Sequence, residues 1–233
     1  MLIVEDLHSY YGRAHIIQGV SFALDAGEVL VLAGRNGAGK STTMKSLIGL
    51  LRPERGRVVF RGADVTGAAP YRVARLGLGY VPEERRIFTE LTVLQNLEVG
   101  RQPARDGRAA WTPARLFALF PNLGALRDRL GGRMSGGEQQ MLTIARTLMG
   151  NPSCVLLDEP SEGLAPVIVE QMARAILALK QEGVAVLLAE QNLYFAARVA
   201  DRAAVIEMGR IVWEGAMAAL MADEALRRAR LGV

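Results

Sequence analysis

The chain has 233 residues, of which 50% are hydrophobic and 22% are charged. This length and composition fit one compound domain with a substantial core, and they exclude intrinsic disorder, a collagen-like repeat and a tandem of full catalytic domains. The net charge of +4 arises from 28 basic and 24 acidic residues without a long basic arm, which favours solvated faces over a nucleic-acid-binding tract.

The charge near the N-terminus and the short length of the aliphatic runs predict a cytoplasmic chain. Acidic Glu5 and Asp6 stand where a secretory signal carries positive charge. The aliphatic runs fall far below the roughly 18 residues of a membrane-spanning helix. Cys154, the single cysteine, lies in an apolar run and is predicted to be a buried thiol without a chemical role.

The first part of the chain predicts short strands and then a strand followed by a helix. Strand candidates at 2–4, 19–24 and 57–60 favour an antiparallel section. Residues 29–33 form an apolar run between glycines, which is typical of a buried strand, and a helix is predicted behind it at 40–50.

Later runs at 154–157 and 184–188 have the same buried-strand character. Between them, apolar residues at helical spacing predict a helix over 166–181, with Pro166 in the first turn and Gly183 just past the end. Strands that alternate with helices predict an α/β fold with a mostly parallel sheet covered on both faces.

Residues of about 88–135 are predicted to form a helical insertion. They contain no convincing buried strand but two helix starts. Thr92 with Gln95 three residues later forms a capping box, and Thr112 precedes Pro113.

The α/β core is therefore predicted to comprise residues 1–87 and 136–233. Near the end of the chain, runs at 203–206 and 211–213 predict a hairpin around a glycine turn. The last turns of the chain are predicted to be helical over 216–230.

The strongest functional signal is a complete G-x4-G-K-S motif between a predicted strand and a predicted helix. Its glycines let backbone N–H groups curl around a β-phosphate. Lys40 would supply positive charge to the β- and γ-phosphates, and the Ser41 hydroxyl would bind Mg2+. The predicted nucleotide-binding residues of this loop are Gly34, Asn36, Gly37, Ala38, Gly39, Lys40, Ser41 and Thr42.

A second signal is an apolar strand that delivers two acids at its end. Asp158 is predicted to hold Mg2+ through water, and Glu159 to polarise the water that attacks a γ-phosphate. Two such acids also occur in ordinary surface turns, but a phosphate loop in the same chain favours the catalytic interpretation.

A third signal lies at the end of the predicted insertion. Ser135 and Glu138 form a capping box that opens a helix, and the two glycines between them leave backbone N–H groups free for an anion. Taken alone this segment is a well-capped helix.

With these three motifs in this order, the chain resembles the ATP-binding subunits of ABC transporters from about residue 2 to at least residue 215. The resemblance implies a P-loop NTPase fold and a Mg2+-dependent ATPase. It also implies that two nucleotide domains pack head to tail, with each ATP between one phosphate loop and the other subunit's signature. The signature residues implied are Ser135, Gly136, Gly137 and Glu138.

Two further segments acquire roles through the same resemblance. Tyr11 corresponds to the aromatic residue that stacks on adenine, with Tyr10 as the neighbouring alternative. Residues 161–166 are similar to the loop that touches the opposite subunit.

Two positions depart from the family pattern. Glu83 stands where a glutamine that senses Mg2+ and the γ-phosphate is usual, and it is a candidate metal ligand. Gln191 stands where a histidine facing the γ-phosphate is usual, and it is a candidate catalytic residue. Gln191 can donate a hydrogen bond but carries no charge, while Glu83 adds negative charge. We therefore expect slow turnover, or assistance from a partner of different sequence.

The segments 80–88, 161–166 and 190–192 are most similar to the smaller ATPase subunit of branched-chain amino acid importers. Importers of urea and short amides are similar enough to stay as alternatives. Glu84 stands where a glycine is common in the group, so the transported solute stays open. The resemblance implies a second ATPase subunit, identical or not, integral-membrane permeases and, indirectly, a periplasmic solute-binding protein. The chain would be held at the inner face of the membrane through the permeases, with no nucleic-acid partner.

Two functions from other classes fit the sequence less well. A soluble ABC ATPase acting on nucleic acid or ribosomes usually carries two nucleotide domains or a long insertion, and this chain has neither. A P-loop kinase would not explain the Ser-Gly-Gly motif at residues 135–137.

Overall fold

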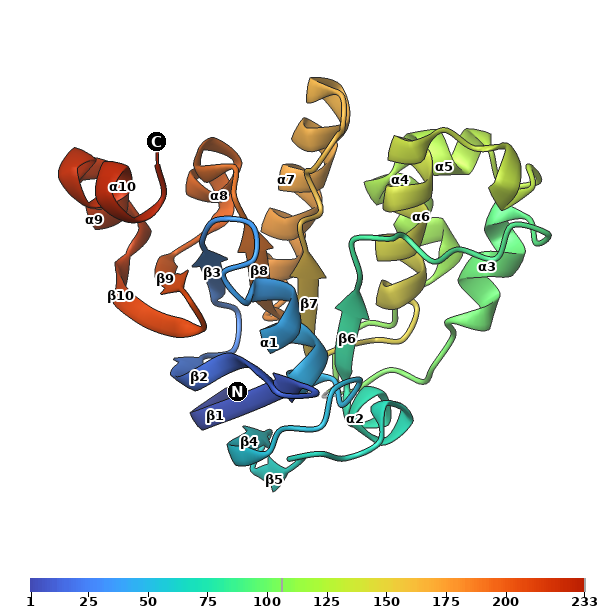
Figure 1. The fold of residues 1–233 in the computed structure, drawn as a ribbon. Helices are drawn as coiled ribbons and strands as arrows, with labels where there is room; N and C mark the ends of the chain where they lie inside the picture. Colours follow the sequence, from blue (N-terminus) through green and yellow to red (C-terminus); the bar gives the residue numbers. More distant parts are fainter. Residues whose placement is uncertain (106, 233) are drawn as a thin grey trace.

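The computed structural model describes residues 1–105 and 107–232. Its larger sheet has six strands in the order β10-β9-β3-β8-β7-β6 (Figure 1). Five of these strands pair in parallel and β10 is antiparallel to β9, which confirms the predicted mostly parallel sheet. The strands are β3 (Val29–Ala33), β6 (Leu78–Val81), β7 (Cys154–Asp158), β8 (Ala185–Glu190), β9 (Arg202–Glu207) and β10 (Arg210–Ala216).

The second sheet is antiparallel, with the order β2-β1-β4-β5, and lies beneath the first in Figure 1. Two of its strands are much longer than the predicted fragments. Register shifts between β1 and β2 break the alternation of apolar residues, so sequence periodicity detects only the ends of each strand. The strands are β1 (Leu2–Tyr11), β2 (Ala14–Leu24), β4 (Arg55–Phe60) and β5 (Ala63–Asp64).

Alternate residues of the central strands enter two separate apolar layers. Val29 and Val31 pack on the side of the long helices, whereas Leu30 and Leu32 pack on the side of α1 and the antiparallel sheet. Both faces of the larger sheet are therefore buried, which explains why the sequences of these strands are continuous apolar runs. The helices concerned are α1 (Lys40–Leu47), α6 (Gly136–Leu148), α7 (Pro166–Gln181) and α8 (Leu193–Val199).

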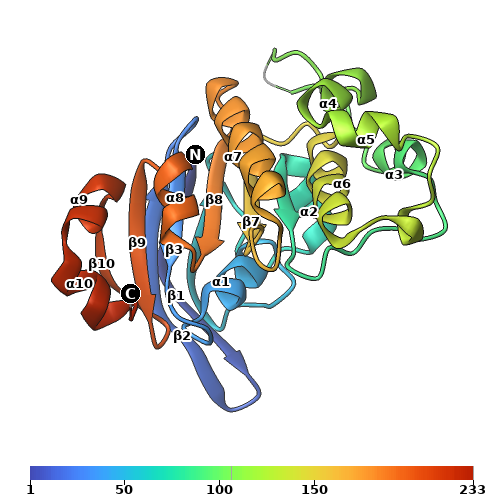
Figure 2. The same ribbon diagram turned by 90° about the horizontal axis from the view of Figure 1, so that it is seen from above.

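The middle of the chain is helical and lies to one side of the core (Figures 1 and 2). Both predicted helix starts are present. The Thr92 Oγ1 accepts from the Gln95 N–H at 3.2 Å, and the Arg115 N–H donates to Thr112 Oγ1 at 3.3 Å. The helices are α3 (Val93–Val99), α4 (Pro113–Leu119) and α5 (Pro121–Ala125), and α2 (Pro70–Leu76) precedes β6.

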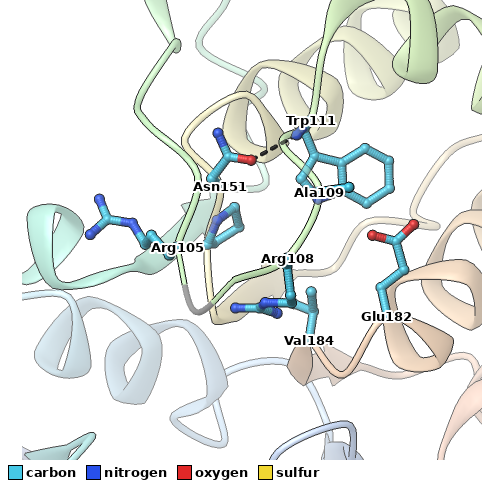
Figure 3. A pocket seen from close by; sticks show the side chains of 8 residues that line it. Arg105, Arg108, Ala109, Trp111, Asn151, Glu182 and Val184 are labelled. Atoms are coloured by element: carbon cyan, nitrogen blue, oxygen red, sulfur yellow. Dashed lines mark hydrogen bonds between the residues drawn. The ribbon is translucent and has the colours of Figure 1, made fainter.

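Asn151 anchors the connection between α3 and α4 to the core (Figure 3). Its Oδ1 accepts from the Trp111 N–H at 2.7 Å, and its Nδ2 donates to the Gln102 carbonyl at 2.7 Å. Asn151 adopts φ 49°, a conformation that asparagine tolerates better than most residues. One buried side chain thus fixes both ends of this connection where α6 leads into β7.

The C-terminal region holds two helices, α9 (Met217–Ala222) and α10 (Glu224–Arg230). The prediction of helical turns over 216–230 is confirmed, with a break at Asp223, whose Oδ1 accepts from the Leu226 N–H at 2.8 Å and caps α10. No helix in the part of the chain described is long and apolar enough to cross a membrane. Cys154 is buried, and burial raises its pKa to about 12, as expected for an inert thiol.

Candidate functional site

The phosphate loop follows β3 and leads directly into α1. Gly34 must be glycine because a Cβ there would collide with the Ile206 carbonyl on β9. Gly37 and Gly39 have φ values of 79° and 114°, which L side chains rarely adopt. The loop is therefore held tightly by the sheet on one side and turns sharply into a helix N-terminus on the other.

Lys40 is 3% exposed and satisfied entirely by protein groups. Its Nζ donates to the Gly34 carbonyl at 2.8 Å and to the Arg35 carbonyl at 3.1 Å. It also lies 3.0 Å from Glu159 Oε1. The ammonium is thus aimed across the loop toward the end of β7.

Asp158 accepts hydrogen bonds on both carboxylate oxygens. Ser41 Oγ donates to Oδ1 at 2.9 Å, and the Tyr80 hydroxyl donates to Oδ2 at 3.1 Å. Burial raises the pKa of Asp158, although both hydrogen bonds oppose that shift. Burial and the neighbouring Asp158 also raise the pKa of Tyr80, so its phenol remains a donor.

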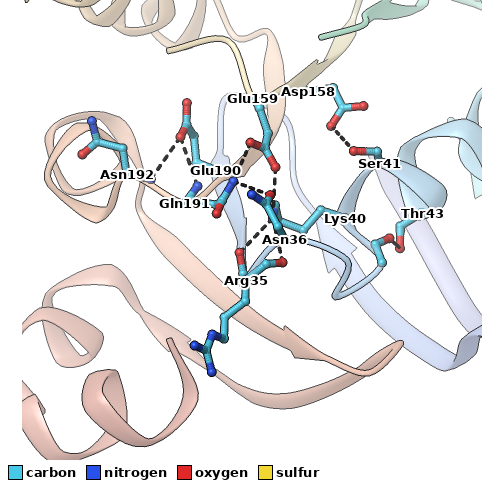
Figure 4. A network of polar contacts seen from close by, with 12 residues as sticks. Arg35, Asn36, Lys40, Ser41, Thr43, Asp158, Glu159, Glu190, Gln191 and Asn192 are labelled. Carbon is cyan, nitrogen blue, oxygen red and sulfur yellow. Dashed lines mark hydrogen bonds and ion pairs between the residues drawn. The ribbon is translucent and has the colours of Figure 1, made fainter. Parts of the chain in front are cut away.

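Glu159 lies next to Asp158 but in a strained backbone conformation, with φ 44°. Gln191 Nε2 donates to Glu159 Oε2 at 2.7 Å and to Asn36 Oδ1 at 2.6 Å (Figure 4). Burial by itself would raise the pKa of Glu159, but the hydrogen bonds from Gln191 and Lys40 outweigh it and lower that pKa. Glu159 is therefore a carboxylate at neutral pH.

A cleft of about 370 Å³ opens above the loop and collects most of the predicted site residues. Tyr11 lies at its mouth and is 50% exposed, whereas Tyr10 stacks on His15 with ring centroids 4.1 Å apart. Glu83 lies at the wall of the same cleft. The residues that line it are Tyr11, Ile16, Asn36, Gly37, Gly39, Lys40, Ser41, Thr42, Glu83 and Glu159.

The predicted signature lies elsewhere, at the start of α6. The Glu138 N–H donates to Ser135 Oγ at 3.4 Å, and the Ser135 N–H donates to Glu138 Oε2 at 2.7 Å, so the predicted capping box is present. Ser135 is exposed. Among the described residues that line the cleft, none belongs to this motif.

A model of the ABC transporter family matches residues 17–162, a stretch that runs from the antiparallel sheet to the loop beyond Glu159. The chain belongs to the ABC transporter family. It is 41% identical to the high-affinity branched-chain amino acid transport ATP-binding protein BraG of Pseudomonas aeruginosa, with both chains covered completely. It is 34% identical to the lipopolysaccharide export system ATP-binding protein LptB of Haemophilus influenzae, over all of this chain and 97% of that one.

A solved nucleotide-free ATP-binding cassette from an ABC transporter has the same fold, with a TM-score of 0.83 and 28% identity. The match covers 100% of this chain and 98% of that cassette. This ABC cassette therefore binds ATP and is an ATPase.

The donors beside the cassette's phosphate loop fit Mg2+. The Ser41 hydroxyl and the Asp158 carboxylate are the oxygen ligands that this ion prefers, and Glu83 adds a third oxygen donor to the cleft. No group of three or more His, Cys, Asp or Glu side chains that could hold a metal ion occurs in the described residues.

Two residues of the ABC cassette's polar network were given no role from sequence. Tyr80 belongs to the segment 80–88, and its hydroxyl donates a hydrogen bond to Asp158. Glu190 ends β8 and is 2% exposed. The signal that would have found Glu190 is the one used for Asp158, an acid placed at the end of an apolar strand.

Proposed function

We propose that this chain is the ATP-hydrolysing subunit of an importer for branched-chain or other hydrophobic amino acids. The observation that carries the proposal is the likeness to BraG over the full length of both chains. Import of urea or short amides is the nearest alternative. The similarity to LptB makes export a second candidate that the experiment below must distinguish.

Binding of ATP would begin with an exchange of partners at Lys40. The loop N–H groups and the N-terminus of α1 attract phosphate, and Lys40 would turn its charge from Glu159 toward the β- and γ-phosphates. Tyr11 would stack on the adenine at the mouth of the cleft. Mg2+, held by Ser41 and Asp158, would neutralise phosphate charge when bound.

Hydrolysis would then use the released carboxylate. Glu159 would accept a proton from the attacking water, and its lowered pKa keeps it available as a base at neutral pH. Gln191 already touches Glu159 and Asn36, so its amide would orient the base and donate to a phosphate oxygen. It would do so without the charge that a histidine can carry.

A second ATPase subunit would complete each site. The exposed Ser135 motif opens a helix with free N–H groups but does not line the cleft of its own chain. Head-to-tail packing would place this motif over the partner's ATP. Closure around the nucleotides and reopening after hydrolysis would then shift the membrane subunits between two states.

A groove of about 580 Å³ between α2, β6, α3 and α6 is suited to the permease subunits. Tyr71, Phe88 and Val99 line it and are each about half exposed. At its floor the Arg146 guanidinium lies over the Phe88 ring, 4.9 Å from the centroid. Among the described residues, Arg146 Nη1 is buried and has no hydrogen-bond partner. A permease segment with apolar side chains would fit this groove, and it would hold the chain at the inner face of the membrane.

The proposal is tested by uptake in cells from which the gene has been deleted. We expect loss of radiolabelled leucine, isoleucine and valine uptake, restored by the wild-type gene but not by a Glu159→Gln variant expressed at the same level. Loss of urea uptake alone would show that the chain serves an importer of urea or short amides instead. Unchanged uptake of all four solutes, with altered export of a lipid or polysaccharide, would overturn import.

A further inference from the structure

We propose that Glu190 is a positioning residue that ties the loop after β7 to the loop after β8 and so holds Gln191 against Glu159. The inference rests on the ATP site proposed above. Glu190 itself does not line the cleft; it would act through the residues that it holds.

The Glu190 carboxylate accepts three backbone hydrogen bonds from two separate loops. The Ser161 N–H donates to Oε1 at 3.0 Å. The Gln191 and Asn192 N–H groups donate to Oε2 at 3.1 Å and 3.2 Å, as Figure 4 shows beside Glu159. Ser161 and Gln191 are thirty positions apart in the chain, so this single side chain sets their relative position.

The arrangement uses both oxygens of the Glu190 carboxyl group as acceptors. Two anionic oxygens can accept all three bonds, whereas a glutamine has one acceptor oxygen and one NH2 donor. Whichever way that amide turns, its NH2 group would face either the Ser161 N–H or the pair from Gln191 and Asn192. Glu190 is 2% exposed, and burial raises its pKa, so an ionised carboxylate at this position is costly.

The two loops joined by Glu190 have different tasks in the proposed mechanism. Gln191 reaches Glu159 and Asn36 with its side chain while its backbone is held by Glu190. Ser161 begins the segment 161–166, which is expected to meet the opposite subunit. Glu190 would therefore transmit a movement of the partner-facing loop to the group beside the base.

The test compares Glu190→Gln and Glu190→Asp with wild type in the purified full-length chain. A matched control is Glu214→Gln, because Glu214 forms an ion pair with Arg202 on β9 and β10, away from the site. For Glu190→Gln we expect ATP affinity within about twofold of wild type and kcat lowered about tenfold to a hundredfold, as for a misplaced catalytic group. Glu190→Asp keeps the charge and should recover part of kcat, whereas the control should match wild type.

A double-mutant cycle with Gln191→Ala separates positioning from general stability. If Glu190 acts through Gln191, Glu190→Gln will cost less in the Gln191→Ala background than in wild type. Wild-type kcat in Glu190→Gln would overturn the inference. So would a double variant whose fold-loss in kcat equals the product of the two single fold-losses, because the two residues would then act independently. If Glu190→Gln does not fold, the cycle is run with Glu190→Asp under the same criteria. Absence of ATP hydrolysis by the wild-type chain would instead overturn the ATP site itself.

Discussion

Lys40 Nζ lies 3.0 Å from Glu159 Oε1, and the two side chains are 3% and 7% exposed. This buried ion pair joins the phosphate loop to the proposed catalytic base. A phosphate group in the cleft competes with Glu159 for the same ammonium, so nucleotide binding and release of the base are coupled through one contact. Removal of either charge leaves the other buried without its partner, which is costly.

Replacement of Glu159 by Gln should preserve ATP binding and lower kcat by about a hundredfold to ten-thousandfold, the usual contribution of a positioned base. The single amide oxygen can still accept from Gln191 once Lys40 has turned toward the phosphates, but the amide cannot take a proton at neutral pH. ATP binding is measured by calorimetry and turnover by phosphate release. Glu182→Gln, at the end of α7 and paired with Arg115, is the control. Normal turnover in Glu159→Gln would show that another group is the base.

Replacement of Gln191 by His should preserve or raise kcat, because an imidazole at this position can donate to a phosphate oxygen and also carry charge. Gln191→Ala, which removes both hydrogen bonds to Glu159 and Asn36, should lower kcat. Steady-state ATPase rates of the two variants give the comparison. A folded Gln191→His variant less active than Gln191→Ala would contradict the proposed position.

Replacement of Tyr80 by Phe should raise the Mg2+ concentration needed for half-maximal ATPase activity by about tenfold, a typical effect of losing a hydrogen bond to a metal ligand. The change removes only the hydroxyl that donates to Asp158 Oδ2. Calorimetric binding of ATP with and without Mg2+ gives a readout independent of turnover. Tyr71→Phe, on α2 and 56% exposed, should leave both measurements unchanged. An unaltered Mg2+ requirement in Tyr80→Phe would show that Ser41 alone orients Asp158.

The raised pKa of Glu190 predicts a specific pH dependence of stability. Burial makes the folded state bind this proton more tightly than the unfolded state, whose pKa is near 4.5. The contribution of Glu190 to the free energy of unfolding should therefore grow as pH falls toward that value and shrink as pH rises through the folded pKa.

Urea unfolding of wild type and Glu190→Gln at pH 7.5, 6.5 and 5.5 tests this pH dependence. The difference in unfolding free energy should move in favour of wild type toward acid, by about 1.4 kcal/mol for each unit of pKa shift. A difference that is constant or reversed would contradict it.

Local signals in the sequence were sufficient where a motif is contiguous. The glycine pattern of residues 34–41, the two capping boxes and the apolar runs that became β3, β7 and β8 each depend on neighbours in the chain. The helix over Pro166–Gln181 was predicted with its observed bounds, because a proline and a glycine mark its ends. Periodicity failed for β1 and β2, where bulges interrupt the alternation.

The sequence by itself determined the family, the fold class and the identity of the phosphate loop, because these follow from residues close together in the chain. Only the tertiary structure decided which distant groups meet. Tyr80 reaches Asp158 because β6 and β7 pair in parallel, and Glu190 joins Ser161 to Gln191 because β7 and β8 end at the same edge of the sheet. Such contacts depend on strand order and register, which are set by the packing of the whole core rather than by any local pattern.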